Sequence, residues 1–381
     1  MLDCLIVGAG PAGAVAATVL ARAGARVRIL DRSMFPRDKL CGDTVNPGTL
    51  GLLRRLNMAA AIDGCGLPVA GMRVTGERGV VIEGRYRDGV TGRALLRRHL
   101  DWMLLQDALA AGAQFEPACT VRGAVVDGSR VAGVRVIGRP FDGEVRARVT
   151  IAADGRRSAL AFGLGMARHP ARPRRWAMGV YVENAAMAGP PRDLGEMHVR
   201  SGRYIGIAPV PGGLTNVCVV RPWTPGQRAI GDPKTAVFGE LARDPLLRDR
   251  FADARLVGPP AVLGPLAVDV NDAVHVDGLL LAGDAAGFID PMTGDGLRFA
   301  VRGAELAALA ALDALEHGWR GVHERLAIRR RAEFSAKWRF NRLLRSLVTS
   351  PAAIGGASWG ARLAPAGLRA AIEYAGDVGY A

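Results

Sequence analysis

The stretch Val7-Gly8-Ala9-Gly10-Pro11-Ala12-Gly13 decides the fold of this 381-residue chain. The apolar run Leu2–Val7 before it is typical of a buried parallel strand, and the small and apolar residues 14–23 after it predict a helix. Gly8 permits a tight turn, Gly10 lets the backbone approach a pyrophosphate, and Gly13 lets the helix pack close to the strand. The segment therefore predicts the phosphate-binding turn of a dinucleotide site.

A second predicted strand, residues 25–30, ends at Asp31. This carboxylate follows the glycines at about the 20-residue spacing expected for an acceptor of ribose hydroxyl groups. Strand, turn, helix, second strand and acid occur in the required order, which favours a nucleotide site over a purely structural glycine turn. This first motif alone leaves NAD and FAD equally open.

Two later motifs favour FAD. Residues 149–153 form a strand-like run that ends in Asp154-Gly155, and residues 278–282 lead into Gly283-Asp284. Residues 291–297, Pro-Met-Thr-Gly-Asp-Gly-Leu, then precede a helical pattern from Arg298 to about Leu315. Taken in this order, the motifs resemble those of the flavoprotein hydroxylase and reductase superfamily, whose fold is that of p-hydroxybenzoate hydroxylase.

The resemblance implies a role for each residue of the last two motifs. Asp284 is expected to bind the ribityl chain of FAD. Gly294, Gly296 and Leu297 are expected to open a helix that directs backbone N–H groups at the pyrimidine edge of the flavin. A helix N-terminus at that edge would stabilise the negative charge of the reduced flavin.

A loop after the second predicted strand indicates which family within this superfamily the chain resembles. Residues 35–43, Phe-Pro-Arg-Asp-Lys-Leu-Cys-Gly-Asp, are similar to the Arg-x-Lys-x-Cys-Gly loop of the geranylgeranyl reductase family, which runs beside the flavin. Cys41 could line the pocket or help to protonate a carbanion after hydride transfer, or it could be a small packed residue. Residues 204–213 partly fit that family's Tyr-x-Trp-x-x-Pro segment, with Gly206 where Trp is expected. Tyr204 is a pocket candidate, and a core tyrosine is the alternative.

A helix is predicted over residues 93–111, and Arg97 in it fits an arginine that the superfamily commonly places near the flavin or its phosphates. Arg98 could take this role instead, or either side chain could be a solvated helix charge. The expected cofactor-binding residues are Gly8, Gly10, Ala12, Gly13, Asp31, Arg32, Lys39, Cys41, Gly42, Arg97, Asp154, Gly155, Gly283, Asp284, Pro291, Gly294, Gly296 and Leu297, and the candidate catalytic residues are Cys41 and Tyr204.

Because the motifs lie near residues 8, 154 and 284, the cofactor domain must be discontinuous. We expect an α/β fold with a Rossmann-like FAD-binding domain, an inserted antiparallel-sheet substrate domain and a C-terminal helical region. The expected parts are residues 1–70, 90–165 and 270–315 for FAD, residues 71–89 and 166–269 for the substrate domain, and residues 316–381 for the helical region.

Composition limits the partners. The formal net charge of +14 favours negatively charged groups such as a pyrophosphate or an anionic lipid surface. No nucleic-acid module is recognisable, so we expect no nucleic-acid partner. The five cysteines form no CxxC pair or Cys/His cluster, which predicts no metal site and reduced thiols in a cytosol. No apolar run is long enough to span a bilayer, so we expect no transmembrane segment.

Arginines, lysines and aromatic residues interleave between Arg320 and Leu347. A basic helix with aromatics could rest on anionic lipid, as a peripheral membrane contact. Alternatively, the helix packs on the cofactor domain and exposes a solvated basic face. The expected localisation is cytoplasmic, with the membrane surface as an open possibility.

The leading functional hypothesis is an FAD-dependent oxidoreductase that reduces a carbon–carbon double bond in an isoprenoid or other hydrophobic substrate. The alternative is an FAD-dependent monooxygenase that hydroxylates an aromatic or polyketide-like molecule. A halogenase is disfavoured because no Trp-x-Trp-x-Ile-Pro run occurs, and a non-enzymatic flavin-binding scaffold is the reading from a different class. No second GxGxxG unit is visible, so NAD(P)H is expected as a transient electron donor, with a partner protein as the other source of electrons.

Overall fold

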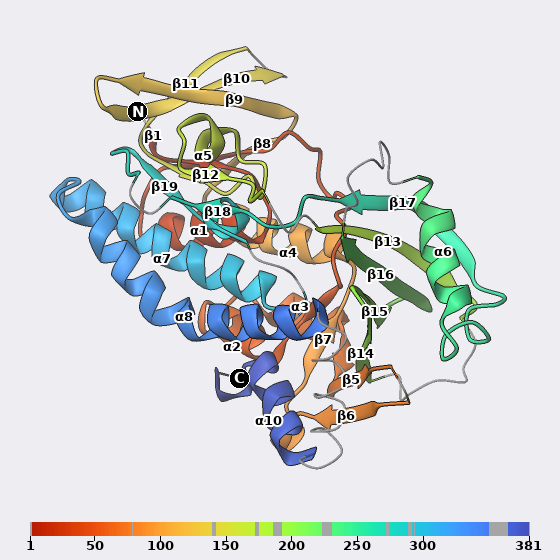
Figure 1. The fold of residues 1–381 in the computed structure, drawn as a ribbon. Helices are drawn as coiled ribbons and strands as arrows, with labels where there is room; N and C mark the ends of the chain where they lie inside the picture. The colour runs from red at the N-terminus through yellow and green to blue at the C-terminus, as the bar shows by residue number, and fades with distance from the viewer. Residues whose placement is uncertain are drawn as a thin grey trace.

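The computed structural model of the protein describes residues 2–77, 79–138, 142–171, 175–185, 193–222, 231–271, 274–288, 292, 294–349 and 365–380. Two seven-stranded sheets organise this part of the chain, and helices pack against both of them (Figure 1). The expected α/β fold class is therefore confirmed.

The first sheet holds the phosphate-binding turn. Its parallel part has the order β8–β2–β1–β11–β19, and β11 continues into an antiparallel meander with β10 and β9. The strands are β1 (Leu2–Val7), β2 (Val27–Leu30), β8 (Gln114–Glu116), β9 (Cys119–Asp127), β10 (Arg130–Gly138), β11 (Gly143–Ala152) and β19 (Leu279–Leu281). Because β1, β2, β11 and β19 run parallel, their carboxyl ends meet at one edge, and there the sequence motifs come together.

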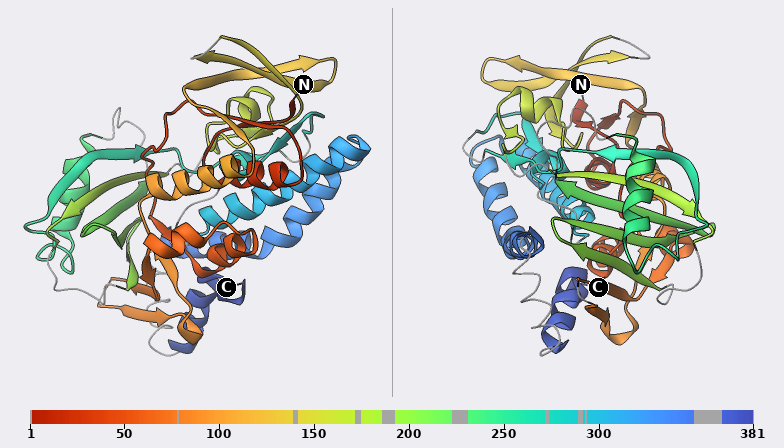
Figure 2. Two further views of the ribbon diagram at one scale, coloured as in Figure 1. Left: turned by 180° about the vertical axis from the view of Figure 1, so that it is seen from behind. Right: turned by 45° about the vertical axis from the view of Figure 1, so that its right-hand side comes forward.

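Helices α1 (Pro11–Arg22), α4 (Arg97–Ala110) and α7 (Gly296–His317) form a layer beside this sheet. Ala14, Ala16 and Ala17 of α1 are fully buried, and their small side chains let α4 and α7 approach closely. Helix α8 (Val322–Thr349) lies along α7, as both views in Figure 2 show.

The second sheet has the order β17–β13–β16–β15–β14–β5–β6. Its strands are β5 (Gly71–Thr75), β6 (Val81–Arg85), β13 (Arg175–Glu183), β14 (Leu194–Arg200), β15 (Arg203–Val210), β16 (Leu214–Pro222) and β17 (Arg255–Leu263). Helix α6 (Pro233–Arg243) covers its outer face, where Val237 and Leu241 enter an apolar core (Figure 2, right). The inner face is turned toward the first sheet and its helices.

Two details differ from the expected elements. The pair β5–β14 is parallel, whereas the other pairs of the second sheet are antiparallel as expected. The helix predicted over residues 93–111 begins only at Arg97. Residues 92–94 are strand β7, which pairs with β3 (Thr44–Val45) and β4 (Leu67–Val69), so long-range pairing overrides the local helical pattern there.

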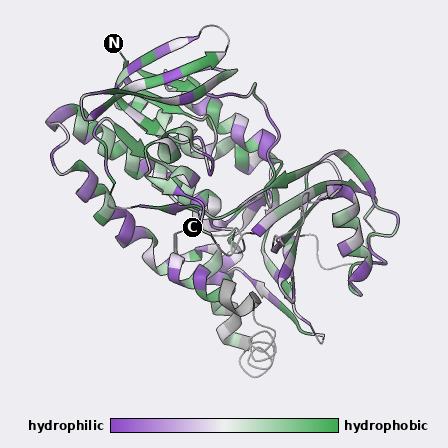
Figure 3. Cartoon of the chain, turned by 45° about the horizontal axis from the view of Figure 1, so that its top comes forward, coloured by the Kyte–Doolittle hydropathy of each residue, from purple (hydrophilic) through white to green (hydrophobic). Residues whose placement is uncertain are grey.

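The remaining elements are short, apart from a C-terminal helix that packs on β6 and β5. They are β3 (Thr44–Val45), α2 (Pro47–Arg55), α3 (Ala60–Cys65), β4 (Leu67–Val69), η1 (Arg87–Gly89), β7 (Gly92–Ala94), α5 (Ala159–Gly163), β12 (Ala167–Arg168), β18 (Asp269–Val270), η2 (Gly283–Ala286), α10 (Pro365–Gly376) and η4 (Val378–Tyr380). Hydrophobic residues occur in both sheets, whereas α8 is largely hydrophilic (Figure 3). Among the described helices, none combines the length and apolar character needed to cross a membrane.

Candidate flavin site

The turn after β1 has no room for side chains at two of its glycines. Gly8 has a φ of +101°, and a Cβ there would overlap the carbonyl oxygen of Ala153. A Cβ on Gly13 would overlap the carbonyl oxygen of Gly8, because α1 starts so close to β1. Gly10 precedes Pro11, the first residue of α1, where the missing proline N–H breaks no helical hydrogen bond. The turn therefore presents bare backbone to a ligand, as a pyrophosphate requires.

Asp31, at the end of β2, fixes this turn. Its Oδ2 accepts a hydrogen bond from the backbone N–H of Ala9 at 2.8 Å, and its Oδ1 accepts one from Ser33 at 2.8 Å. Each carboxylate oxygen can accept a further bond, and Asp31 also lines the cavity described next. It is therefore placed both to hold the turn and to meet a ribose.

A single cavity of about 760 Å³ connects the motifs. The predicted residues that line it are Gly8, Gly10, Ala12, Asp31, Arg32, Lys39, Cys41, Gly42, Arg97, Asp154, Gly155, Tyr204, Gly283, Asp284, Gly294, Gly296 and Leu297. Gly13 lies under the turn, where it permits the close packing of α1. Pro291 lies outside the described residues.

Asp154 gives a test of whether this cavity suits a nucleotide. Its Oδ2 accepts a hydrogen bond from the backbone of Ala159 at 2.9 Å, while its Oδ1 is buried and has no partner among the described residues. Burial raises the pKa of this carboxyl group. A buried acceptor without a partner costs free energy unless a ligand donates to it. The Asp154 side chain therefore fits the adenosine end of FAD, which carries hydroxyl and amino donors.

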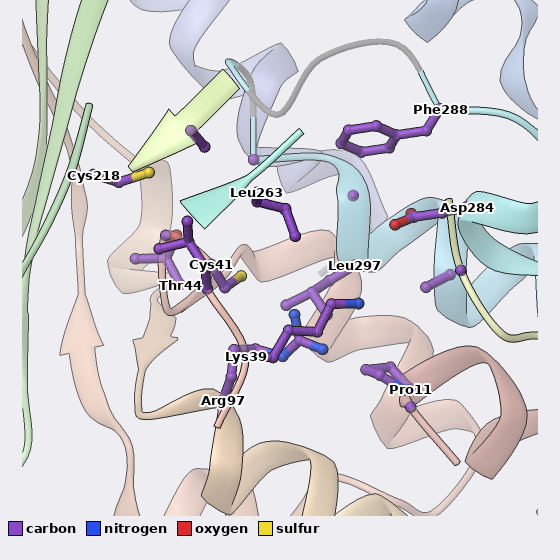
Figure 4. A pocket seen from close by; sticks show the side chains of 18 of the residues that line it. Pro11, Lys39, Cys41, Thr44, Arg97, Cys218, Leu263, Asp284, Phe288 and Leu297 are labelled. Carbon is purple, nitrogen blue, oxygen red and sulfur yellow. The ribbon is translucent and has the colours of Figure 1, made fainter. Parts of the chain in front are cut away.

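Positive charge gathers in the middle of the cavity (Figure 4). Arg97 is nearly buried and forms an ion pair with Asp101 at 2.8 Å. Burial opposes the charge of Arg97, but Asp101 more than compensates and raises its pKa. Lys39 lies beside it, and burial and the nearby Arg97 lower its pKa. Arg98 does not line the cavity, so of the two arginines Arg97 is the one at the site.

The loop that carries Cys41 is held by residues that the sequence did not single out. Asp43 accepts hydrogen bonds from the Tyr181 hydroxyl at 2.6 Å and from the Asn216 amide at 2.5 Å. The same amide donates to the carbonyl oxygen of Cys41 at 2.8 Å. Burial raises the pKa of Asp43 to about 6, although the two donors oppose this shift. The acid directly after Cys-Gly was the one available signal for this cluster.

The N-terminus of α7 is linked to the C-terminal segment by a second unpredicted cluster. Asp295, directly before α7, is fully buried and lies 3.4 Å from the ammonium group of Lys337. Lys337 also pairs with Asp377 at 3.0 Å, and Asp377 pairs with Arg298 at 2.8 Å. The residues expected at the pyrimidine edge of the flavin therefore sit on a helix end held by charges from α8 and the C-terminus.

The second sheet and the C-terminal helices form the other end of the cavity. Tyr204 is buried on β15, and its ring lies 5.8 Å from the guanidinium carbon of Arg175. The far end is apolar and is lined by Val69, Met72, Val74, Phe340, Leu344 and Ile372. One continuous space thus joins the nucleotide motifs to an apolar chamber.

Comparison with known proteins places the chain in a family. The model of the FAD binding domain family matches residues 1–331. The chain is 30% identical over 328 residues to a menaquinone reductase of Mycolicibacterium smegmatis, covering 80% of this chain and 75% of the relative. It is 31% identical over 335 residues to digeranylgeranylglycerophospholipid reductase 2 of Methanopyrus kandleri, covering 82% and 78%.

It is also 29% identical to conditioned medium factor receptor 1 of Dictyostelium discoideum over 82% of this chain, but it spans only 63% of that protein's length. Among solved structures, a flavin-dependent brominase superposes with a TM-score of 0.84 at 19% identity, covering 98% of this chain and 93% of that one. A myxobacterial chondrochloren halogenase gives 0.81 at 23% identity, covering 89% and 81%. These structures share the fold. The chain belongs to the FAD-binding domain family and is an FAD-dependent oxidoreductase.

Proposed function

We propose that the protein reduces a carbon–carbon double bond in an isoprenoid or other hydrophobic substrate. The observation that carries this proposal is the continuous cavity, in which the Cys41 loop lies between the nucleotide motifs and an apolar chamber. A hydrophobic chain buried in that chamber gains about 25 cal/mol for each Å² removed from water. The names of the curated relatives, digeranylgeranylglycerophospholipid reductase and menaquinone reductase, support a reductase that acts on an isoprenoid or quinone substrate.

In this proposal, the predicted site residues bind FAD or contact the substrate. FAD, when bound, supplies the hydride. The backbone from Gly8 to Gly13 and Asp31 hold its pyrophosphate and ribose, Asp284 meets the ribityl chain, and the N-terminus of α7 stabilises negative charge on the reduced ring. Lys39 and Arg97 supply positive charge beside it. Cys41 is proposed as the proton-donating thiol or as a wall of the pocket, and Tyr204 as a substrate contact.

We also propose the domain division expected above, with FAD held by residues 1–70, 90–165 and 270–315. The assignment of β1, β2, β8–β11 and β19 to one sheet and of β5, β6 and β13–β17 to the other supports it. NAD(P)H is the proposed transient electron donor.

One anaerobic experiment tests the reaction. The purified holoprotein is reduced with NADH or NADPH, mixed with geranylgeraniol, and followed by the return of the oxidised flavin spectrum and by product mass. Reoxidation with a product that has gained two hydrogens supports the reductase. Reoxidation only after oxygen is admitted, with a hydroxylated product, establishes the monooxygenase alternative instead. Absence of turnover under both conditions would favour the flavin-binding scaffold.

A peripheral membrane contact through α8 is a further part of the proposal. Arg329, Arg331, Arg339 and Arg342 lie exposed on this helix, together with Ile328 (64% exposed) and Leu343 (58% exposed). Cations flanking exposed apolar residues suit an anionic lipid surface. Phe340 and Leu344 of the same helix line the apolar chamber, so a lipid substrate would arrive near its binding place.

Sedimentation with vesicles tests this contact. The protein should sediment with phosphatidylglycerol vesicles and not with phosphatidylcholine vesicles. Arg339→Glu combined with Arg342→Glu should abolish sedimentation without loss of FAD, because both side chains are exposed. Equal sedimentation of the variant and the wild type would contradict the contact.

A further inference from the structure

The inner face of the second sheet carries a row of unusually small residues. Directly paired positions run across five strands through Met197, Gly206, Cys218, Gly179 and Ala261. Directly opposed residues in a sheet point to the same face. Four of these five line the cavity, and Gly179 is covered by the loop side chain of Leu40. Three of the five have no side chain or only a methyl group.

A neighbouring row on the same face is larger. It runs through Val199, Tyr204, Val220, Ala177 and Leu263, all of which line the cavity. The sheet surface therefore drops from this row to the small residues at Gly206 and Cys218. We call the depression bounded by Met197, Tyr204, Gly206 and Cys218 the Gly206 trough.

The space over Gly206 is open. The nearest atom to a Cβ built there is the carbonyl oxygen of Cys218, at 3.9 Å. At Gly179, in the same row, a Cβ would overlap the side chain of Leu40. Leu40 directly precedes Cys41, so the loop that carries the thiol closes one end of the trough. The open part thus lies next to the loop expected beside the flavin.

The walls of the trough are aromatic and sulfur-rich. Tyr204 forms one side, Met197 and Cys218 supply sulfur atoms, and Phe288 and Met292 pack against the same apolar cluster. Thioether and thiol sulfurs contact aromatic rings favourably, and the floor at Gly206 is a bare peptide on which a flat group can lie. Figure 4 shows Cys218 and Phe288 at the two sides of this part of the pocket, with Leu263 between them.

We propose that the Gly206 trough binds a planar aromatic or quinonoid ring of the substrate, and that the absence of a side chain at Gly206 determines this specificity. An apolar tail attached to the ring would extend into the chamber lined by Val74, Phe340 and Leu344. The inference rests on the proposed function only in taking this cavity as the substrate site. The proposed function describes the substrate only as a hydrophobic molecule, and this inference adds that the substrate contains a planar ring.

Binding to the oxidised holoprotein tests the trough without turnover. Menadione serves as a ring without a tail and geranylgeraniol as a tail without a ring, each titrated by the perturbation of the flavin absorption spectrum. Gly206→Leu should weaken menadione binding about tenfold or more, because a filled pocket excludes a ring. Geranylgeraniol binding should stay within about twofold. Gly206→Ala should also weaken the binding of menadione, but by a smaller factor than Gly206→Leu.

Leu344→Phe is the matched control, because it adds volume in the apolar chamber of the same cavity and lies on helix α8, outside the sheet that carries the trough. This variant should weaken the binding of geranylgeraniol and leave the binding of menadione unchanged. Retained FAD absorption verifies that each variant is folded. Failure of the wild type to bind menadione, or an equal effect of Gly206→Leu on both probes, overturns the trough. Alkene reduction without ring binding overturns this inference alone, whereas ring binding without alkene reduction overturns the proposed reductase alone.

Discussion

The Tyr181 hydroxyl donates a 2.6 Å hydrogen bond to the carboxylate of Asp43, across a separation of 138 residues. Tyr181 belongs to the second sheet, and Asp43 ends the loop that carries Cys41. Asn216, on the adjacent strand, donates to the same oxygen. The contact therefore fixes the position of the loop relative to the sheet that covers the substrate end of the cavity.

Removing this carboxylate should loosen the loop. Asp43→Ala leaves the half-buried Tyr181 hydroxyl without its acceptor and leaves the Asn216 amide only the carbonyl oxygen of Cys41, which costs about 1–3 kcal/mol for each group. We expect the free energy of unfolding, measured in urea, to fall by about 2–5 kcal/mol, and turnover to fall with it. Tyr181→Phe removes one hydrogen bond only and should cost about 1 kcal/mol. Equal stability of Asp43→Ala and the wild type would show that the cluster has no anchoring role.

The protonation of Asp43 should appear in the pH dependence of stability. Burial raises its pKa to about 6, above the value of about 4 expected in the unfolded chain. The resulting stabilisation is fully present below about pH 4 and is lost as the pH rises through about 6. Asp43→Asn cannot ionise, so its stability relative to the wild type should improve by up to about 3 kcal/mol across this range. A difference that is constant with pH would contradict the raised pKa.

Two glycine substitutions should have opposite outcomes. Gly13→Ala places a Cβ against the carbonyl oxygen of Gly8, so α1 must move away from the turn. We expect loss of FAD and a fall of about 3 kcal/mol or more in the free energy of unfolding, the range of severe overpacking. Gly64→Ala, in the exposed part of α3, meets no atom within 4 Å and should stabilise the protein by up to about 1 kcal/mol. Retained FAD in Gly13→Ala would refute the packing argument.

The cluster at the C-terminus should respond strongly to loss of one charge. Asp377→Asn keeps the left-handed backbone (φ +54°) that asparagine tolerates. Arg298 then keeps Glu333 and Lys337 keeps Asp295, but the buried cluster carries an excess positive charge, which should cost about 1–3 kcal/mol. Faster proteolysis of the C-terminal segment should accompany the loss. Glu373→Gln breaks the pair with exposed Arg87 and should cost less than about 1 kcal/mol. Similar losses in both variants would argue against a special role of the buried cluster.

Substitution of Asp284 tests the binding of FAD itself. Asp284→Ala should release the yellow cofactor during gel filtration, because the proposed ribityl contact is lost. Asp277→Ala is a suitable control, since Asp277 precedes the same strand but does not line the cavity. Flavin content per protein, measured from the absorption spectrum, checks both. Full retention of FAD in Asp284→Ala would place the ribityl contact elsewhere.

The sequence by itself determined the parts of the site that depend on local backbone geometry. The requirement for glycine at positions 8 and 13 arises within one strand–turn–helix unit, and Asp31 follows at a fixed spacing. The three motifs in their order carried a family resemblance that predicted FAD, and their spacing predicted a discontinuous cofactor domain. The family match over residues 1–331 agrees with the prediction of FAD.

Only the tertiary structure decided which residues from other segments contact these motifs. Residues 92–94 became a strand because β3 and β4 pair with them. Asp43 forms a hydrogen bond with Tyr181, and Lys337 forms an ion pair with Asp377. Both contacts join segments that are distant in the chain, so no local sequence pattern predicts them. Gly206 could be read from the sequence as a missing tryptophan, but only strand register brought it beside Cys218 and left the space open. Register depends on the packing of the whole sheet, so the shape of the substrate end could not be deduced from the chain in isolation.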